Sequence, residues 1–267
     1  MRRPSINDSF RRIRSRMSSS GKNILILDYD GTLAPFRINP SDAEPYEGVR
    51  EMLGRIQATG AEVYLVTGRE PEEVKELLSL PVAPEIWRCH GAVRMTADGR
   101  REMPEVPEAG LKALEEAEKA AREIGLGRVE RKSTSIALHW RGEPAEAEGK
   151  IRRLVLEAWA KISHEGFSVQ KFDGGMEFRL EGFDKGKAVE AIMSRYTQQD
   201  YGVFLGDDQT DEDAFSTMKK LGGLGILVRA KCRETAAGLW LKPPEGLLAF
   251  LDLWLRGVSE RRDSPNA

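Results

Sequence analysis

Short, unbroken runs of apolar residues are the feature that most restricts how this chain can fold. Residues 23–28 read NILILD, residues 61–68 read AEVYLVTG, and residues 201–208 read YGVFLGDD. Strands buried on both faces read as continuous apolar runs, and they are typical of parallel sheets with helices on both sides. Amphipathic helical patterns accompany these runs at residues 48–60, 71–80, 185–196, 210–222 and 245–257. The sequence therefore predicts an α/β fold built on a doubly wound, mostly parallel sheet of Rossmann-like type.

The middle of the chain has a different pattern. Two helices are expected at residues 108–125 and 144–162, and each is followed by a pair of β-like runs, at 128–142 and 167–182. We expect the turn of the second hairpin at Gly174-Gly175. The order αββαββ predicts an α+β domain inserted into the core. The expected domains are a basic N-terminal arm (1–22), a discontinuous core (23–100 and 183–257), the insert (101–182) and a C-terminal tail (258–267).

Composition and charge exclude several classes of function. The formal net charge of −2 gives no argument for binding nucleic acid or an anionic membrane, and no stretch approaches the roughly 20 apolar residues that span a bilayer. The two cysteines, Cys89 and Cys232, match no metal-binding spacing. A reduced, cytoplasmic setting is the simpler interpretation, although a disulfide is an alternative. We expect a monomer with no nucleic-acid or membrane partner.

The first 22 residues are rich in Arg and Ser and nearly free of acids. They lack the apolar core of a secretory signal. Phe10, Ile13 and Met17 have helical spacing, so a short basic helix packed on the core is one hypothesis. A disordered tail and an organelle transit peptide are the alternatives.

Polar residues follow the predicted strands where each strand ends. Asp28 and Asp30 follow the first strand, Thr67-Gly68-Arg69 follow the second, and Asp207, Asp208 and Asp211 follow a later one. Lys185 begins the helix after the insert. Ligand sites in doubly wound sheets lie beyond the carboxyl ends of the strands, so we expect these residues to share one edge.

Acids at this density repel one another unless a cation neutralises them. Carboxylate ligands without His or Cys favour a hard ion, and Mg²⁺ is the natural candidate. A hydroxyl, helix-start amides and a Lys beside Mg²⁺ would make a phosphate site. One carboxylate could then attack phosphorus while another served as acid and base. Capping of the strand end is the structural alternative for Asp28 and Asp30 taken alone.

The motifs DYDGT, Thr67-Gly68, Lys185-Gly186 and GDDQTDED occur in an order that resembles the haloacid dehalogenase-like phosphohydrolase superfamily. The insert between the second and third motifs resembles the larger type of cap domain in that superfamily. More narrowly, the chain resembles the trehalose-6-phosphate phosphatase family from about Asn23 to Trp254. The segments that carry this resemblance are LDYDGTLAPF, His90-Gly91, VERKSTSIALHWR, FDKGKAV and GDDQTDEDAF.

The resemblance implies a Mg²⁺-dependent phosphatase that converts trehalose 6-phosphate to trehalose and phosphate through an aspartyl-phosphate. It implies Asp28 as the nucleophile and Asp30 as the general acid and base. Phosphate binding would fall to Thr67, Gly68 and Lys185. The implied metal site comprises Asp28, Asp30 (through its backbone carbonyl), Asp207, Asp208 and Asp211.

Sugar recognition is expected from the cap and its hinge. The implied substrate-binding residues are Arg69, His90, Gly91, Glu130, Lys132, Arg141 and Glu177, with His139 as a further cap position. Solvent-facing strand positions are the alternative for Glu130 and Lys132, and a core histidine is the alternative for His139. Arg88-Cys89 stands where the family more often has Gly-Asn, which bears on sugar preference and not on hydrolysis.

Other functions stay open at this stage. A phosphatase for sucrose-phosphate, mannosyl-3-phosphoglycerate or glucosylglycerol-phosphate would need only a different cap lining. A phosphomutase shares the paired acids. An inactive sugar-phosphate sensor, or a scaffold for a synthase partner, would be expected to lack an Asp or the Lys, and Asp28, Asp30, Lys185 and Asp207 are all present.

Overall fold

The computed structural model describes residues 6–37, 39–88, 92–162 and 165–262. The chain forms two compact units. The first comprises Met1–Glu102, Asp184–Asp207 and Asp211–Ala267, and the second comprises Met103–Phe183 and Asp208–Thr210.

The first unit contains an eight-stranded sheet with the order β12-β11-β10-β1-β2-β3-β4-β5. All neighbours from β12 to β3 are parallel, and β4 and β5 are antiparallel additions at one edge. Every residue of β1 and β10 is buried, as their unbroken apolar sequences predict. The strands are β1 (Asn23–Leu27), β2 (Glu62–Val66), β3 (Glu85–Arg88), β4 (Val93–Met95), β5 (Arg101–Glu102), β10 (Tyr201–Gly206), β11 (Leu224–Val228) and β12 (Leu239–Leu241).

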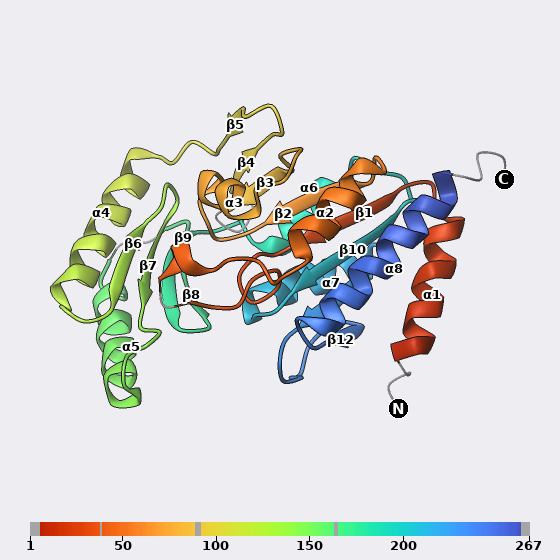
Figure 1. Cartoon of the computed structure of the whole chain (residues 1–267). Helices are drawn as coiled ribbons and strands as arrows, with labels where there is room; N and C mark the ends of the chain where they lie inside the picture. The colour runs from red at the N-terminus through yellow and green to blue at the C-terminus, as the bar shows by residue number, and fades with distance from the viewer. Residues whose placement is uncertain (1–5, 38, 89–91, 163–164, 263–267) are drawn as a thin grey trace. The chain divides into compact units, whose positions relative to one another are not determined.

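Helices cover both faces of this sheet (Figure 1). One apolar cluster joins β1 and its neighbours to α1, α2, α3 and α8, and a second joins the opposite face to α6 and α7. These are α1 (Ile6–Ser19), α2 (Val49–Ala58), α3 (Pro71–Leu78), α6 (Lys185–Met193), α7 (Glu212–Lys220) and α8 (Glu245–Arg262), with short 3-10 turns at Pro40–Asp42 (η1) and Gln209–Asp211 (η3). The predicted doubly wound α/β fold is confirmed.

The basic leader forms helix α1 and packs on α8. Phe10 contacts the ring of Phe250 with centroids 6.5 Å apart, and Ile13 and Met17 are buried. Arg14 pairs with Glu260 at 2.7 Å. The helical alternative is therefore the correct one for residues 6–19.

The second unit is a four-stranded antiparallel sheet with the order β6-β7-β9-β8 and helices α4 and α5 on one face (Figure 1). Its elements are α4 (Glu108–Glu123), β6 (Arg128–Arg131), β7 (Ser135–His139), α5 (Ala145–Trp159), β8 (Phe167–Phe172) and β9 (Gly175–Leu180). The observed order is the predicted αββαββ.

The hairpin turn between β8 and β9 differs from the prediction by one residue. It lies at Asp173-Gly174, where Gly174 has φ +86°, and Gly175 is already the first residue of β9. The ring of Phe172 occupies the place that a Cβ on Gly175 would need. The second glycine thus provides space for a side chain, while the first provides the turn.

Candidate active site

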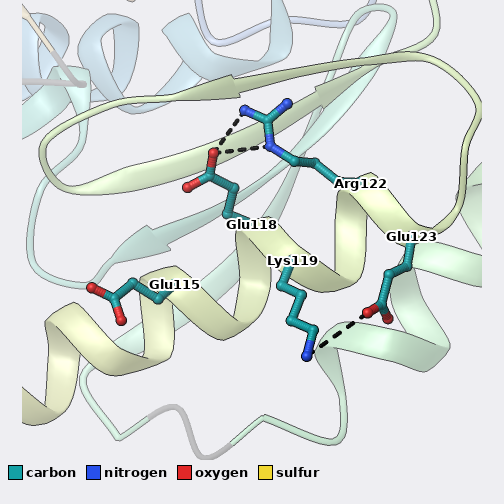
Figure 2. Close-up of a pocket in the computed structure, with 5 residues that line it drawn as sticks. All are labelled: Glu115, Glu118, Lys119, Arg122 and Glu123. Atoms are coloured by element: carbon teal, nitrogen blue, oxygen red, sulfur yellow. Dashed lines mark hydrogen bonds and ion pairs between the residues drawn. The ribbon is translucent and has the colours of Figure 1, made fainter.

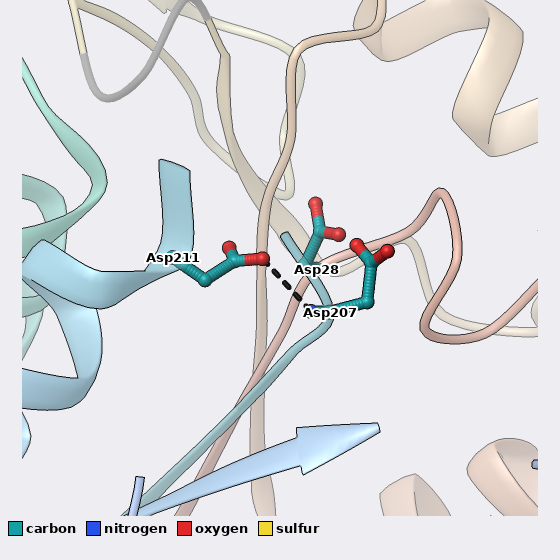
Figure 3. A group of neighbouring side chains, drawn as sticks. All are labelled: Asp28, Asp207 and Asp211. Atoms are coloured by element: carbon teal, nitrogen blue, oxygen red, sulfur yellow. Dashed lines mark hydrogen bonds between the residues drawn. The ribbon is translucent and has the colours of Figure 1, made fainter. Parts of the chain in front are cut away.

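The buried strands bring two acids to one edge of the first unit's sheet. Leu27, the last residue of β1, is paired with Leu205 of β10, and the Asp28 N–H donates to the Leu205 carbonyl at 2.9 Å. Asp207 directly follows β10. Because the two strands are parallel neighbours, Asp28 and Asp207 leave the sheet side by side (Figure 3).

Asp211 completes a group of three buried carboxylates. The Asp207 N–H donates to Asp211 Oδ2 at 2.8 Å, and Figure 3 shows this contact beside Asp28. Each of the three residues offers an oxygen within 4.8 Å of the others. Glycine at position 206 is required because a Cβ there would overlap the Asp211 carboxyl group.

Lys185 neutralises part of this acidic group. Its Nζ donates to Asp28 Oδ1 at 2.8 Å and to Asp211 Oδ1 at 2.7 Å. Lys185 is the first residue of helix α6. Asp184 caps this helix, because its side chain accepts a hydrogen bond from the Lys187 N–H at 2.7 Å. Burial alone lowers the pKa of Lys185, but the carboxylates of Asp211 and Asp28 outweigh it and raise that pKa.

For the Asp28 carboxyl group, the effect of burial on the pKa outweighs the effect of the neighbouring Lys185 charge. Burial raises its pKa, the Lys185 ammonium lowers it, and the Asp211 carboxylate raises it again, with a net value of about 7. A buried carboxyl group with incomplete charge compensation would gain from a divalent cation.

The oxygen-only donor set fits Mg²⁺. Asp28, Asp207 and Asp211 present carboxylate oxygens and no sulfur or nitrogen ligand, which matches a hard cation. Gly31 makes room beside them, since a Cβ there would overlap the Asp207 carboxylate, and its φ of +77° also favours glycine.

Two residues of the predicted metal site are not in this group. Asp208 is not one of its three members, and it groups with the second unit. The Asp208 carboxylate instead accepts from the Asp173 N–H at 2.8 Å, so Asp207 and Asp208 are not equivalent. The Asp30 side chain is also outside the group and pairs with Arg69 at 2.7 Å. Metal binding through the Asp30 carbonyl stays a prediction.

Thr67 and Gly68 follow β2 at the same edge, because β2 is the parallel neighbour of β1. Thr67 is fully buried. Its N–H donates to the Trp87 carbonyl at 2.8 Å, and its Oγ1 accepts from the Arg69 N–H at 3.2 Å. The predicted His90 and Gly91 lie outside the described residues.

Two further residues contact the acids. Thr32 Oγ1 donates to Asp28 Oδ2 at 3.3 Å, and Arg229 Nη1 donates to the Asp207 carbonyl at 3.2 Å. Neither was predicted. Thr32 lies within the DYDGT motif, and Arg229 directly follows the apolar run of β11. Both positions could therefore have been identified from the sequence as lying at the end of a buried strand.

In the second unit, Glu177 and Lys132 lie together on the sheet face opposite the helices. Glu130, Ala137 and Glu177 form one cross-strand row, and the next row packs against α4 and α5. Glu177 Oε1 accepts from Lys132 Nζ at 3.2 Å and from Ser135 Oγ at 2.7 Å. Ser135 is a further member of this group that the sequence prediction missed.

Glu130 and His139 form a second pair on that face, 2.8 Å apart. Burial raises the pKa of Glu130, but the hydrogen bond from His139 and the charge of Lys132 outweigh it and lower that pKa to about 2. Burial lowers the pKa of His139, and the bond to Glu130 opposes this only in part. His139 is therefore a partly buried histidine with a hydrogen-bonding partner. Arg141 donates to the Asp173 carbonyl at the β8–β9 turn.

A depression along α4 is lined by Glu115, Glu118, Lys119, Arg122 and Glu123 (Figure 2). Arg122 pairs with Glu118 at 2.7 Å, and Lys119 lies 4.0 Å from Glu123. These are ordinary i, i+4 pairs on an exposed helix face, and they give no indication of a ligand site.

Several known proteins resemble this chain in sequence or in fold. A sequence model of the trehalose-phosphatase family matches residues 26–242. The trehalose-phosphate phosphatase of Mycobacterium marinum is 30% identical over 240 residues, which cover 85% of this chain and 60% of that protein. An uncharacterized glycosyl hydrolase of Mycobacterium tuberculosis is 29% identical over 253 residues, which cover 88% of this chain and 18% of that protein. The C-terminal domain of C. albicans trehalose-6-phosphate phosphatase superposes with a TM-score of 0.82 at 17% identity, covering 96% of this chain and 98% of that one.

The fold is shared with a phosphatase of the haloalkanoate (HAD) enzyme superfamily from Bacteroides thetaiotaomicron, which superposes with a TM-score of 0.59 at 16% identity, covering 89% of this chain and 96% of that one. The chain itself belongs to the trehalose-phosphatase family. None of the helices in the described ranges is both long and apolar enough to cross a membrane.

Proposed function

We propose that this protein is a Mg²⁺-dependent phosphatase that hydrolyses trehalose 6-phosphate to trehalose and phosphate. The observation that carries the proposal is the group of Asp28, Asp207 and Asp211 around Lys185 in a chain of the trehalose-phosphatase family. Phosphoryl transfer depends mainly on positioning and on neutralising charge, and a buried group of carboxylates with one ammonium is suited to both.

In the proposed first step, an Asp28 carboxylate oxygen attacks phosphorus. The bond between phosphorus and the sugar oxygen breaks, its electrons remain on that oxygen, and Asp30 donates a proton to it. Trehalose leaves, and Asp28 carries the phosphoryl group. Protonation matters because a sugar alkoxide is a poor leaving group.

In the proposed second step, water attacks the phosphorus of the aspartyl-phosphate. Asp30, now ionised, takes the water proton, the bond to Asp28 breaks, and inorganic phosphate leaves. Thr67 and Lys185 would hold the phosphoryl oxygens throughout. Mg²⁺ bound by Asp28 and Asp207, with Asp211 in support, would neutralise the charge on those oxygens.

Sugar recognition is assigned to the second unit. Glu177 with Lys132, and Glu130 with His139, place acceptors and donors next to each other on one sheet face. Disaccharide hydroxyls both donate and accept, so alternating groups of this kind suit them. Arg141 is proposed to contribute at the edge of the same sheet.

The test is phosphate release from trehalose 6-phosphate, sucrose 6-phosphate, glucose 6-phosphate and mannosyl-3-phosphoglycerate in the presence of Mg²⁺. We expect kcat/KM for trehalose 6-phosphate to exceed the others by at least about tenfold, the scale that a few lost sugar contacts produce. A higher kcat/KM for another sugar phosphate would change the proposed substrate but not the proposed reaction. No release from any of them would contradict the proposal.

A further inference from the structure

We infer that Arg69 is a positioning residue that fixes the orientation of the Asp30 carboxylate. This inference rests on the proposed function, in which Asp30 is the acid and base. The sequence prediction gives Arg69 a different role, that of binding substrate.

The contact between the two residues is a bidentate fork. Arg69 Nε donates to Asp30 Oδ2 at 2.7 Å, and Arg69 Nη2 donates to Asp30 Oδ1 at 2.7 Å. Two parallel charge-assisted hydrogen bonds hold a carboxylate in the plane of the guanidinium, so they determine its rotation as well as its position. A single contact from a lysine would leave that rotation free.

Arg69 is itself held firmly. Its Nη1 donates to Glu73 of α3, and its guanidinium lies over the Tyr29 ring, 5.2 Å from the centroid. Its backbone N–H donates to Thr67 Oγ1 at 3.2 Å. Only 8% of the Arg69 side chain is exposed, compared with 29% of Asp30. The clamp is therefore buried, while the carboxylate that it holds keeps an open side.

These contacts favour a positioning role for Arg69 over direct contact with a sugar. Each of its three guanidinium nitrogens already donates to a carboxylate. The same contacts explain why Asp30 and Asp28 differ although they are two residues apart. Asp28 lies against Lys185, whereas Asp30 is turned toward the α3 side of the sheet by Arg69.

Orientation of a general acid has a specific kinetic consequence. A sugar oxygen must be protonated as its bond to phosphorus breaks, whereas a p-nitrophenolate leaves without a proton. Loss of the clamp should therefore reduce the kcat/KM of a sugar phosphate much more than that of p-nitrophenyl phosphate. A purely structural role would reduce both equally.

The experiment compares wild type, Arg69→Ala, Arg69→Lys and Asp30→Asn on the best sugar phosphate and on p-nitrophenyl phosphate. The matched control is Arg94→Ala, which removes a similar fork: Arg94 Nε and Nη2 each donate to a Glu85 oxygen at 3.0 Å. Glu85 begins β3, at the opposite end of the strand from the candidate site. Thermal unfolding of each variant checks that it is folded.

We expect Arg69→Ala to lower kcat/KM about 100-fold for the sugar phosphate and less than about fivefold for p-nitrophenyl phosphate, the cost typical of a misplaced catalytic group. Arg69→Lys should also lower kcat/KM more for the sugar phosphate than for p-nitrophenyl phosphate, with a smaller loss than in Arg69→Ala. Arg69→Lys provides the test if Arg69→Ala does not fold. Arg94→Ala should leave both values within about twofold, as for a site away from the chemistry.

Asp30→Asn should show the same imbalance, and adding Arg69→Ala to it should cause little further loss, because both changes remove one function. Equal losses on the two substrates, unchanged activity or increased activity in the Arg69 variants would each overturn the inference. A wild-type protein inactive on every sugar phosphate would instead contradict the proposed function.

Discussion

The Lys185 ammonium lies 2.8 Å from Asp28 Oδ1 although the two residues are 157 positions apart in the sequence. Nearly all of the second unit lies between them along the chain. Both residues, together with Asp207, Asp211, Thr67 and Arg69, belong to the first unit. The groups proposed to act on phosphorus are thus assembled by one sheet.

Removal of divalent cations should abolish phosphate release, and added Mg²⁺ should restore it. Mg²⁺ should also raise the midpoint of thermal unfolding, because a ligand at 100 times its Kd stabilises the folded state by about 2.7 kcal/mol. Differential scanning fluorimetry with and without EDTA measures this shift. Asp207→Asn should lose it, and activity that survives thorough chelation would contradict the metal site.

Gly31→Ala should impair the site through space as well as backbone strain. A Cβ at Gly31 would overlap the Asp207 carboxylate, and φ is +77°. Gly99 is the matched control, with φ +86° and no atom within 4 Å of the added Cβ. We expect each change to cost about 1 kcal/mol of unfolding free energy or more. Only Gly31→Ala should also weaken the activity and the Mg²⁺-dependent rise in the midpoint of thermal unfolding. Equal activity in the Gly31→Ala and Gly99→Ala variants would contradict this prediction.

Glu177→Gln should reduce kcat/KM for trehalose 6-phosphate by at least about tenfold, since a neutral amide weakens charged hydrogen bonds worth about 1.5–3 kcal/mol. Hydrolysis of p-nitrophenyl phosphate should change little, because that substrate has no sugar. Glu143, an exposed acid on the loop before α5, provides the control substitution. Equal losses on both substrates would place Glu177 outside sugar recognition.

Glu130 should make the stability of the second unit depend on pH. Its pKa of about 2 in the folded protein lies below the ordinary 4.5. The ionised carboxylate therefore stabilises the fold fully above about pH 4.5, and this contribution disappears as the pH falls toward 2. We expect Glu130→Gln to cost about 1 kcal/mol at pH 7, allowing for partial exposure, and less at pH 3. Urea unfolding at both pH values measures this; a pH-independent difference would contradict the assignment.

Much of the fold and the acidic group could be predicted because their causes are local in the sequence. Continuous apolar runs identify buried strands, and an acid at the end of such a run must lie at the edge of the sheet. Asp28 and Asp207 follow from that rule alone. Strand β12 (Leu239–Leu241) was missed because three residues are too few to show a period.

The partner of Asp30 could not be predicted. Arg69 is 39 positions away, and many other arginines in the chain have the same chemistry. The choice depends on how β1, β2 and α3 pack, which is a property of the tertiary structure. For the same reason, the family resemblance implied Glu130, Glu177 and His139 as cap positions without pairing Glu130 with His139 or Glu177 with Ser135.

The most direct test of the central claim is phosphate release from trehalose 6-phosphate by wild type and Asp28→Asn in the presence of Mg²⁺. An amide cannot act as the nucleophile, so we expect kcat to fall by at least about 10³-fold. The circular dichroism spectrum should stay unchanged, because Lys185 keeps its bond to Asp211. A folded Asp28→Asn protein that releases phosphate at nearly the wild-type rate would contradict the account.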